Sequence, residues 1–248
     1  MIELFRGQFR KVRRLYRFAM VLLRARHEFA RAERSGAAPP SARAAILRQT
    51  CQQSLAALDI EVEVEGAPPT YGLLVSNHLS YLDILVYSSL LPCAFVSKTE
   101  IGRWPVFGQY AISGGTIFVQ RERLSSSRRA NQQIVQYLKD GVPVVLFPEG
   151  TTTDGSQVLR FHSSMLQTAI DAGVAVTPCA VRYEVSEGTE IDVAWWGEMT
   201  LAPHVLKLLA RRWVRVKVRF GEPLTPMRSR KALSDEARAR VVALREKL

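Results

Sequence analysis

From residue 60 onward the chain alternates short apolar runs with stretches of helical periodicity, and this alternation constrains the fold most strongly. The runs are short and rich in Val, Ile, Phe and Tyr, which predicts strands. The predicted strands are IEVEVEG (60–66), YGLLVS (71–76), CAFVSK (93–98), TIFVQR (116–121), VPVVLF (142–147), VAVTPCAVRY (174–183), IDVAWW (191–196) and VRVKVRF (214–220). Apolar strands separated by helices indicate an α/β fold, with a mixed, mostly parallel sheet and helices on both faces.

Helices are predicted between these strands and before the first of them. Helical stretches lie at 81–91, 125–139, 162–172, 203–212 and 234–247, and another lies at 41–58. The segment ERSGAAPPSARA (33–44) contains Gly and two prolines, which predicts a hinge or linker. We therefore divide the chain of 248 residues into an N-terminal helical segment over 1–60 and an α/β domain over 61–248.

The segment MIELFRGQFRKVRRLYRFAMVLLRARHEF has the pattern of an amphipathic helix. Six apolar residues recur every three or four positions and share one face: Phe5, Phe9, Val12, Tyr16, Ala19 and Leu23. Five arginines fall beside this stripe: Arg6, Arg10, Arg13, Arg17 and Arg24. This pattern is typical of a helix lying in a membrane interface, and the alternative is a helix docked on its own core. The longest apolar run, FAMVLL, is shorter than the roughly 20 residues that span a bilayer.

The net charge of +11 is concentrated at the two ends of the chain. Residues 1–34 carry a net charge of +7 and residues 211–248 carry +8, whereas the middle carries −4. Basic ends attract an anionic partner, either a membrane surface or nucleic acid. The sequence contains no recognisable nucleic-acid-binding motif, so we expect an anionic membrane surface, with a basic nucleic-acid-binding protein as the alternative of a different class.

The three cysteines, Cys51, Cys93 and Cys179, are far apart and form no CxxC pair. This spacing argues against a disulfide framework or a zinc site and fits a reducing compartment. We therefore expect no metal and no cofactor. The expected location is the cytoplasmic face of the cell membrane, with the protein attached peripherally and not secreted.

Three polar clusters fall where predicted strands end. NHLSYLD (77–83) follows the second strand, Arg121 ends the fourth strand and Glu122 follows it, and PEGTTTDG (148–155) follows the fifth. Active residues of α/β sheets gather at the ends of strands. If these strands are neighbours, the three clusters converge on one edge of the sheet.

His78 and Asp83 are the residues best suited to acid–base chemistry. A neutral imidazole can take a proton from a hydroxyl, and a carboxylate can orient the ring and stabilise its charged form. Without a side-chain nucleophile, such a pair suits a hydroxyl supplied by the substrate. The alternative is structural, because Ser80 and Asp83 ahead of ILVY also fit a helix capping box.

The motifs NHLSYLD, GGTIFVQR, FPEGT and VTPCAV, in this order, resemble the glycerolipid acyltransferase family, best known from 1-acylglycerol-3-phosphate acyltransferases. The resemblance covers roughly residues 70 to 225. It implies an α/β fold and transfer of an acyl chain from a thioester, carried by coenzyme A or acyl carrier protein, to a lysolipid hydroxyl in phospholipid biosynthesis. It also implies that His78 is the general base and that Asp83 orients it.

The same resemblance assigns the substrate-binding residues. It implies that Arg121 binds the anionic head group of the acceptor and that Glu149 and Gly150 shape the acceptor site. Three further residues are assigned to substrate binding with them: Asn77, Thr151 and Arg160.

The chain departs from phosphatidate-forming members after the FPEGT motif. Many of these continue with Arg and a basic FKKG-like segment, whereas this chain has Thr152 and, further on, His162 and Ser163. The segment DGSQVLRFHSS looks more like the lyso-ornithine lipid O-acyltransferase branch. Lysophosphatidate and lyso-ornithine lipid therefore both stand as expected acceptors, and a catalytically silent lipid-binding member is a further alternative.

Overall fold

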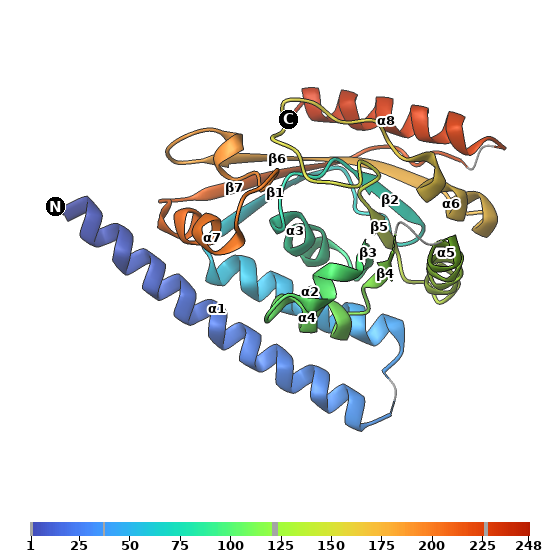
Figure 1. Cartoon of the computed structure of the whole chain (residues 1–248). Helices are drawn as coiled ribbons and strands as arrows, with labels where there is room; N and C mark the ends of the chain where they lie inside the picture. The colour runs from blue at the N-terminus through green and yellow to red at the C-terminus, as the bar shows by residue number, and fades with distance from the viewer. Residues whose placement is uncertain (1, 37, 121–123, 226–227) are drawn as a thin grey trace.

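The chain folds around one seven-stranded sheet, shown in the computed structural model of Figure 1. The structure describes residues 2–36, 38–120, 124–225 and 228–248. The strands are β1 (Ile60–Glu65), β2 (Leu73–Ser76), β3 (Ala94–Lys98), β4 (Ile117–Val119), β5 (Val144–Leu146), β6 (Val176–Val185) and β7 (Val214–Phe220). Their order across the sheet is β1-β7-β6-β2-β5-β3-β4.

Five neighbouring strands, from β6 to β4, run parallel to one another. Strands β1 and β7 are parallel to each other, and β7 is antiparallel to β6. The predicted mixed, mostly parallel sheet is confirmed.

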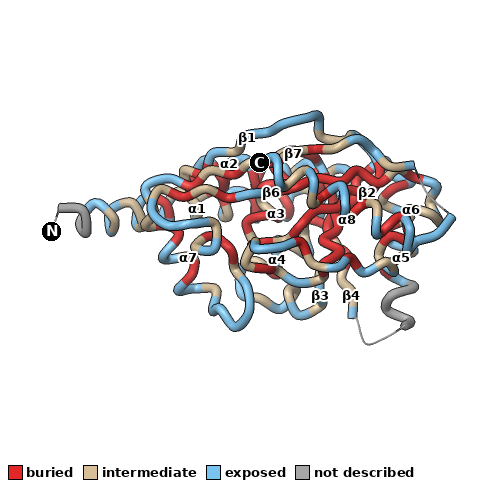
Figure 2. Tube along the Cα trace, turned by 90° about the horizontal axis from the view of Figure 1, so that it is seen from above, coloured by how far each residue is buried: buried red, intermediate tan, exposed pale blue. Residues whose placement is uncertain are grey.

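Helices cover both faces of this sheet (Figure 1). They are α1 (Ile2–Arg34), α2 (Pro40–Ala57), α3 (Leu82–Leu90), α4 (Phe107–Ser113), α5 (Leu124–Lys139), α6 (Gln167–Ala172), α7 (Leu201–Ala210) and α8 (Arg230–Glu246). Successive side chains of a strand point to opposite faces, so Leu74 packs in the core under α2, α3 and α7, whereas Leu73 packs in the core under α5, α6 and α8. Figure 2 shows buried residues concentrated in the middle of the molecule, around β2 and β6.

The segment IDVAWW was predicted as a strand, and this prediction is wrong. Glu190–Asp192 form a short 3-10 helix, and Trp195 lies in the loop that follows it. Val193 and Ala194 are buried without joining a strand ladder, so the apolar run reflects packing alone. The 3-10 helix Thr99–Arg103 and helix α4 were not predicted, because Pro105 and the left-handed backbone of Val106 (φ 65°) interrupt the helical pattern between them.

Helix α1 has apolar side chains on two faces. The predicted apolar stripe lies on the face that points away from the rest of the protein. Phe9, Val12, Tyr16 and Leu23 are 60–67% exposed. The helix docks through another set of residues, in which Arg14, Val21, Ala25 and Phe29 are buried and Phe18 is partly buried. The helix therefore docks on its own core, as the alternative expected, but through residues other than the predicted apolar stripe. Figures 1 and 2 show the first turns of α1 extending past the sheet.

Arginines of α1 fix the helix to the rest of the protein. The Arg14 guanidinium is 2% exposed and donates to the backbone carbonyls of Leu209, Arg211 and Arg212, at and just beyond the C-terminus of α7. A cation is favoured at this end of a helix. Three arginines also meet Asp59: Arg13, Arg14 and Arg17. Burial alone would raise the pKa of Asp59, but its hydrogen bonds with Arg17 and Arg14 and the charge of Arg13 outweigh burial, so this pKa is lowered.

Among the residues described by the structure, no helix is both long and apolar enough to cross a bilayer.

Candidate active site

The polar clusters after β2 and β5 meet at one edge of the sheet. These two strands are parallel neighbours, so the segments that follow them leave the sheet on the same side. The third cluster, Arg121 and Glu122, lies outside the described residues. The convergence predicted for NHLSYLD and FPEGT is therefore present in the fold.

His78 and Asp83 are in direct contact. Nδ1 of His78 lies 2.7 Å from Oδ2 of Asp83. In the neutral imidazole Nδ1 carries the proton and donates it to the carboxylate, which leaves Nε2 with its lone pair. The His78 side chain is 19% exposed and that of Asp83 is fully buried, so the imidazole is accessible and its partner is not.

The position of His78 is fixed from several directions. Its ring stacks on Phe147 with 3.9 Å between centroids and 13° between planes. Its backbone N–H donates to Oε1 of Glu149 at 2.8 Å, and its carbonyl accepts the N–H of Thr153 at 2.9 Å. The segment from 147 to 153 thus holds the ring and backbone of His78 against β2.

Asp83 collects donors from the loop before α3. Oδ2 accepts the backbone N–H of Leu79 at 2.7 Å and of Ser80 at 3.1 Å, in addition to Nδ1 of His78. The predicted capping box is only half correct. Asp83 reaches back to the Ser80 N–H, but the buried Ser80 hydroxyl has no partner among the described residues, and α3 begins at Leu82.

Asn77 braces two strands. Its side chain is 1% exposed, and its amide donates to the carbonyl of Val181 at 3.0 Å and accepts the N–H of Val181 at 2.9 Å. The backbone pairing of β2 with β6 ends at Ser76, and the Asn77 side chain extends the contact between the two segments through these two hydrogen bonds. Both ends of the amide are therefore engaged with the backbone next to the His78–Asp83 pair.

Glu149 joins the two active-site loops. Its carboxylate accepts the N–H of His78 through Oε1 and the N–H of Leu159 through Oε2 at 2.7 Å. Burial raises the pKa of Glu149, and these two backbone hydrogen bonds offset part of that effect. The side chain is 4% exposed, so its carboxylate supports the loops from inside.

The remaining predicted residues lie in the loop after Glu149. Gly150 adopts a left-handed backbone with φ of 71°, which a side chain would strain, and it lets the chain turn at the end of FPEG. Thr151 and Arg160 are exposed. Arg160 directly follows Leu159, whose N–H bonds to Glu149, so the loop returns to the site at this point.

Two features of the site were missed in the sequence. Tyr183 on β6 donates its hydroxyl proton to Oδ1 of Asp83 at 2.5 Å. Tyr81 and Trp104 each contact Trp195 edge-on, with centroids 6.2 and 5.4 Å apart, and Tyr81 also bonds to Nδ1 of His204. No local pattern connects these residues, because they are far apart in the sequence and only the tertiary fold brings them together.

The arrangement can accept a proton from a hydroxyl that reaches Nε2 of His78. The buried charge of Asp83 stabilises the imidazolium that results. Among the described residues, no group of three or more His, Cys, Asp and Glu side chains could hold a metal ion.

Comparison with known proteins identifies the family. The family model "Acyltransferase" matches residues 59–182, half of the chain. A lyso-ornithine lipid O-acyltransferase from Brucella abortus is 38% identical over 195 residues, which cover 73% of this chain and 72% of that protein. A 1-acyl-sn-glycerol-3-phosphate acyltransferase from Neisseria meningitidis is 32% identical, over 86% of this chain and 83% of that protein.

The fold agrees with this assignment. The crystal structure of the 1-acyl-sn-glycerophosphate acyltransferase PlsC from Thermotoga maritima superposes with a TM-score of 0.73, over 99% of this chain and 97% of that one, at 21% identity. The matched model includes the segments of both His78 and Glu149. The chain therefore belongs to the acyltransferase family.

Proposed function

We propose that this enzyme transfers an acyl chain from an acyl thioester to the free hydroxyl of a lysolipid, at a membrane surface. The observation that carries the proposal is the 2.7 Å contact between His78 and the fully buried Asp83, at the end of a strand in a chain of this family. It leaves one accessible ring nitrogen facing away from its carboxylate partner, which is the arrangement a general base for a substrate hydroxyl requires.

The proposed reaction needs one proton carrier. Nε2 of His78 removes the proton of the lysolipid hydroxyl as its oxygen attacks the thioester carbonyl. The tetrahedral intermediate then collapses, the C–S bond breaks, and the departing thiolate takes the proton back from Nε2. A thioester is already activated, so positioning of the two substrates and stabilisation of the oxyanion supply the remaining catalysis.

The acceptor that we favour is lyso-ornithine lipid. The relative from Brucella abortus carries that name, and Thr152 and His162 stand where many phosphatidate-forming members carry cations. A phosphate monoester requires several fixed cations or N–H donors. Lysophosphatidate is the second candidate, supported by the name of the Neisseria meningitidis relative and by the exposed Arg160. The thiol carrier is coenzyme A or acyl carrier protein.

Membrane attachment is assigned to the N-terminal segment over 1–60. The exposed apolar side chains of Phe9, Val12, Tyr16 and Leu23 would enter the lipid interface, and the exposed Arg24 would face anionic head groups. The three cysteines are free and buried, which fits a reducing compartment and hence the cytoplasmic face of the membrane.

Thiol release by the purified protein tests the reaction. Palmitoyl-CoA and palmitoyl carrier protein would each be offered with lyso-ornithine lipid or lysophosphatidate, to the wild type and to His78→Ala. We expect release that depends on one acceptor and falls by about 10²- to 10⁴-fold in the variant, the usual contribution of a general base. His27→Ala, which removes an exposed histidine of α1 away from the site, is the matched control. Full activity of His78→Ala would refute the assignment of the base.

A further inference from the structure

The Asp83 carboxylate is held through both of its oxygens, and the reaction described above uses only one of them. Oδ2 meets His78 and two backbone N–H groups. Oδ1 accepts the phenolic O–H of Tyr183 at 2.5 Å, from a residue 100 positions further along the chain. A fully buried carboxylate oxygen without a donor is costly, so this bond stabilises the carboxylate in its present orientation.

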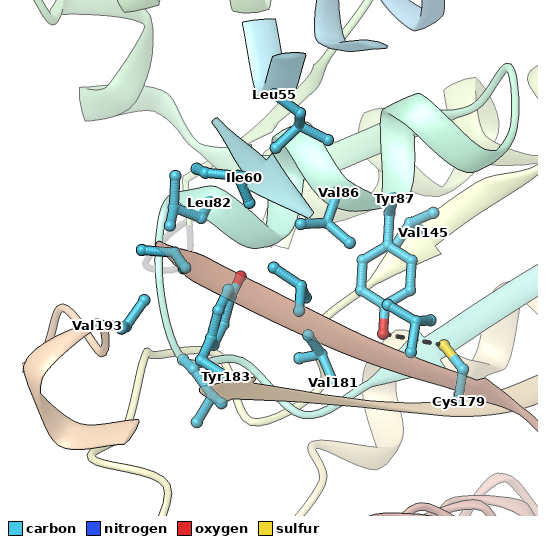
Figure 3. Close-up of a cluster of buried hydrophobic side chains, with 14 of the residues drawn as sticks. Leu55, Ile60, Leu82, Val86, Tyr87, Val145, Cys179, Val181, Tyr183 and Val193 are labelled. Atoms are coloured by element: carbon cyan, nitrogen blue, oxygen red, sulfur yellow. Dashed lines mark hydrogen bonds between the residues drawn. The ribbon is translucent and has the colours of Figure 1, made fainter. Parts of the chain in front are cut away.

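The Tyr183 hydroxyl is the donor in its hydrogen bond with Asp83. Tyr183 is 1% exposed, and Figure 3 shows its ring within the cluster of buried side chains that includes Val181 and Val193. Burial raises the pKa of Tyr183 well above its ordinary value, and the charge of Asp83 raises it further. The phenol therefore keeps its proton throughout the pH range in which a histidine base operates.

We propose that Tyr183 is a positioning residue of the His78–Asp83 pair. Its O–H fixes the rotation of the carboxylate, so that Oδ2 faces Nδ1 of His78, and it draws part of the carboxylate charge toward Oδ1. It acts through Asp83 and does not touch the substrate, because it bonds to the oxygen that His78 does not use. This inference rests on the proposed role of His78 as the base.

Other ionisable groups face the pair from the surrounding elements. Glu149, after β5, accepts the backbone N–H of His78. Tyr87 on α3 bonds to Ser76 and Cys179. Glu190 accepts the N–H of Tyr183 and is paired with Arg245 of α8. Within the described residues, His78 and Tyr183 are the two side chains that bond to the Asp83 carboxylate.

The test is Tyr183→Phe, which removes one oxygen from a buried ring. Without the phenolic donor, more negative charge remains on Oδ2, so the protonated form of His78 is stabilised. Because the base must be neutral to act, the acid limb of the kcat/KM profile moves to higher pH, by about half a unit to one unit. We expect kcat to fall roughly tenfold through misorientation of Asp83, with KM unchanged.

Tyr87→Phe is the matched control. Tyr87 is also fully buried in the same cluster, and Figure 3 shows its hydroxyl bonded to Cys179. The two variants lose the same atom from the same core, so they share any general loss of packing or stability. We expect the acid limb of Tyr87→Phe to stay at its wild-type position. Equal shifts in both variants, or no shift in Tyr183→Phe, would reduce Tyr183 to a packing role.

A measurement on the wild type avoids any dependence on the folding of a variant. NMR with labels on the histidine rings and on tyrosine Cζ would follow both residues in one titration. We expect the Cζ resonance of Tyr183 to move with the same midpoint as the ring of His78, because Asp83 connects them. A Tyr183 resonance that does not follow His78 would overturn the inference. Failure of the proposed function is a separate outcome. His78→Ala would then keep full activity, while Tyr183 and His78 of the wild type would still titrate with the same midpoint.

Discussion

The active-site edge of the sheet and the outer face of α1 both depart from the usual distribution of side chains, in opposite directions. At the edge, the polar side chains of Asn77, Asp83 and Glu149 are at most 4% exposed. On α1, the apolar side chains of Phe9 and Tyr16 are more than 60% exposed. These three buried polar groups have partners inside the protein, whereas nothing in the described part of the chain covers Phe9 and Tyr16. Buried polar groups that are hydrogen-bonded within the protein indicate a preformed site. Exposed apolar side chains on one face of a helix indicate a surface for contact with another molecule.

The same comparison holds between two arginines of α1. Arg14 is buried and donates to backbone carbonyls near the end of α7, whereas Arg24, on the same helix, is exposed. Sequence position beside an apolar stripe is common to many arginines of this helix. Their energetic roles differ because only some of them meet protein groups.

The largest expected effect comes from Asp83→Asn, which removes the charge of the buried carboxylate and part of its hydrogen bonding. The amide cannot accept from His78, Leu79 and Ser80 and also preserve the charge that stabilises the imidazolium. We expect kcat to fall by roughly 10³- to 10⁴-fold with little change in KM, measured as thiol release under saturating acceptor. Asp154→Asn, in the neighbouring loop, is the control and should retain activity within about twofold. A loss below tenfold in Asp83→Asn would contradict the assigned role.

Arg14→Met would break the docking of α1 while retaining much of the side-chain volume. Three backbone carbonyls and Asp59 lose their buried donor, and we expect the free energy of unfolding to fall by about 3 kcal/mol in urea titrations. Arg24→Met on the same helix should change it by less than about 0.5 kcal/mol. It should instead weaken binding to anionic vesicles by about 1 kcal/mol. Equal destabilisation by both substitutions would remove the distinction between the two arginines.

Replacing Phe9, Tyr16 and Leu23 together by Ser tests the outer face of α1. Each side chain would contribute about 1 kcal/mol to insertion, so partition into vesicles containing anionic lipid should fall by roughly 100-fold in a flotation assay. Thermal stability should be unchanged, because these side chains are exposed. The control replaces Val64 and Ile191, which are exposed elsewhere on the molecule, and should bind normally. Unchanged partition of the triple variant would refute the membrane assignment.

Glu149→Gln gives the smallest effect and depends on pH. Burial raises the pKa of Glu149, so the folded state binds this proton more tightly than the unfolded state does. The carboxyl's contribution to stability is then complete at low pH and declines as pH rises through the raised pKa. Gln takes up no proton on folding and so lacks this pH-dependent contribution. We therefore expect the deficit of Glu149→Gln relative to the wild type to be largest near pH 4, at about 1–2 kcal/mol, and to narrow toward neutrality.

Urea titrations at several pH values measure this deficit. Glu222→Gln, at an exposed carboxyl, should show a deficit close to zero and independent of pH. A Glu149→Gln deficit that widened with pH would contradict the burial argument.

Much of the fold could be predicted because local pattern and tertiary packing agree. The run VRVKVRF alternates, and β7 occupies those residues with every second one buried. IDVAWW failed because its apolar content serves packing in a loop. In α1 the sequence offers two faces, and Arg14 on the docking face makes that side look polar, so periodicity could not say which face is covered.

At the site, predictability follows separation along the chain. His78 and Asp83 are five residues apart, within reach of one turn, and their pairing could be inferred locally. The bond between His78 and Glu149 spans 71 residues and was foreseen only as a shared sheet edge. Tyr183 is 100 residues from Asp83, and its selection depends on the register of β6 against β2, which no sequence pattern specifies.

The carbonyls that hold Arg14 belong to residues 209–212, so this contact cannot form until nearly the whole chain has been synthesised. The same delay applies to β1, whose first residue, Ile60, pairs with Val214 of β7. The outer face of α1 needs no such wait, because its residues are complete within the first 23 positions. Under the proposed membrane attachment, α1 could therefore meet a lipid surface during translation before its docking site on α7 exists. The chain topology orders these events, with attachment possible early and closure of the fold late.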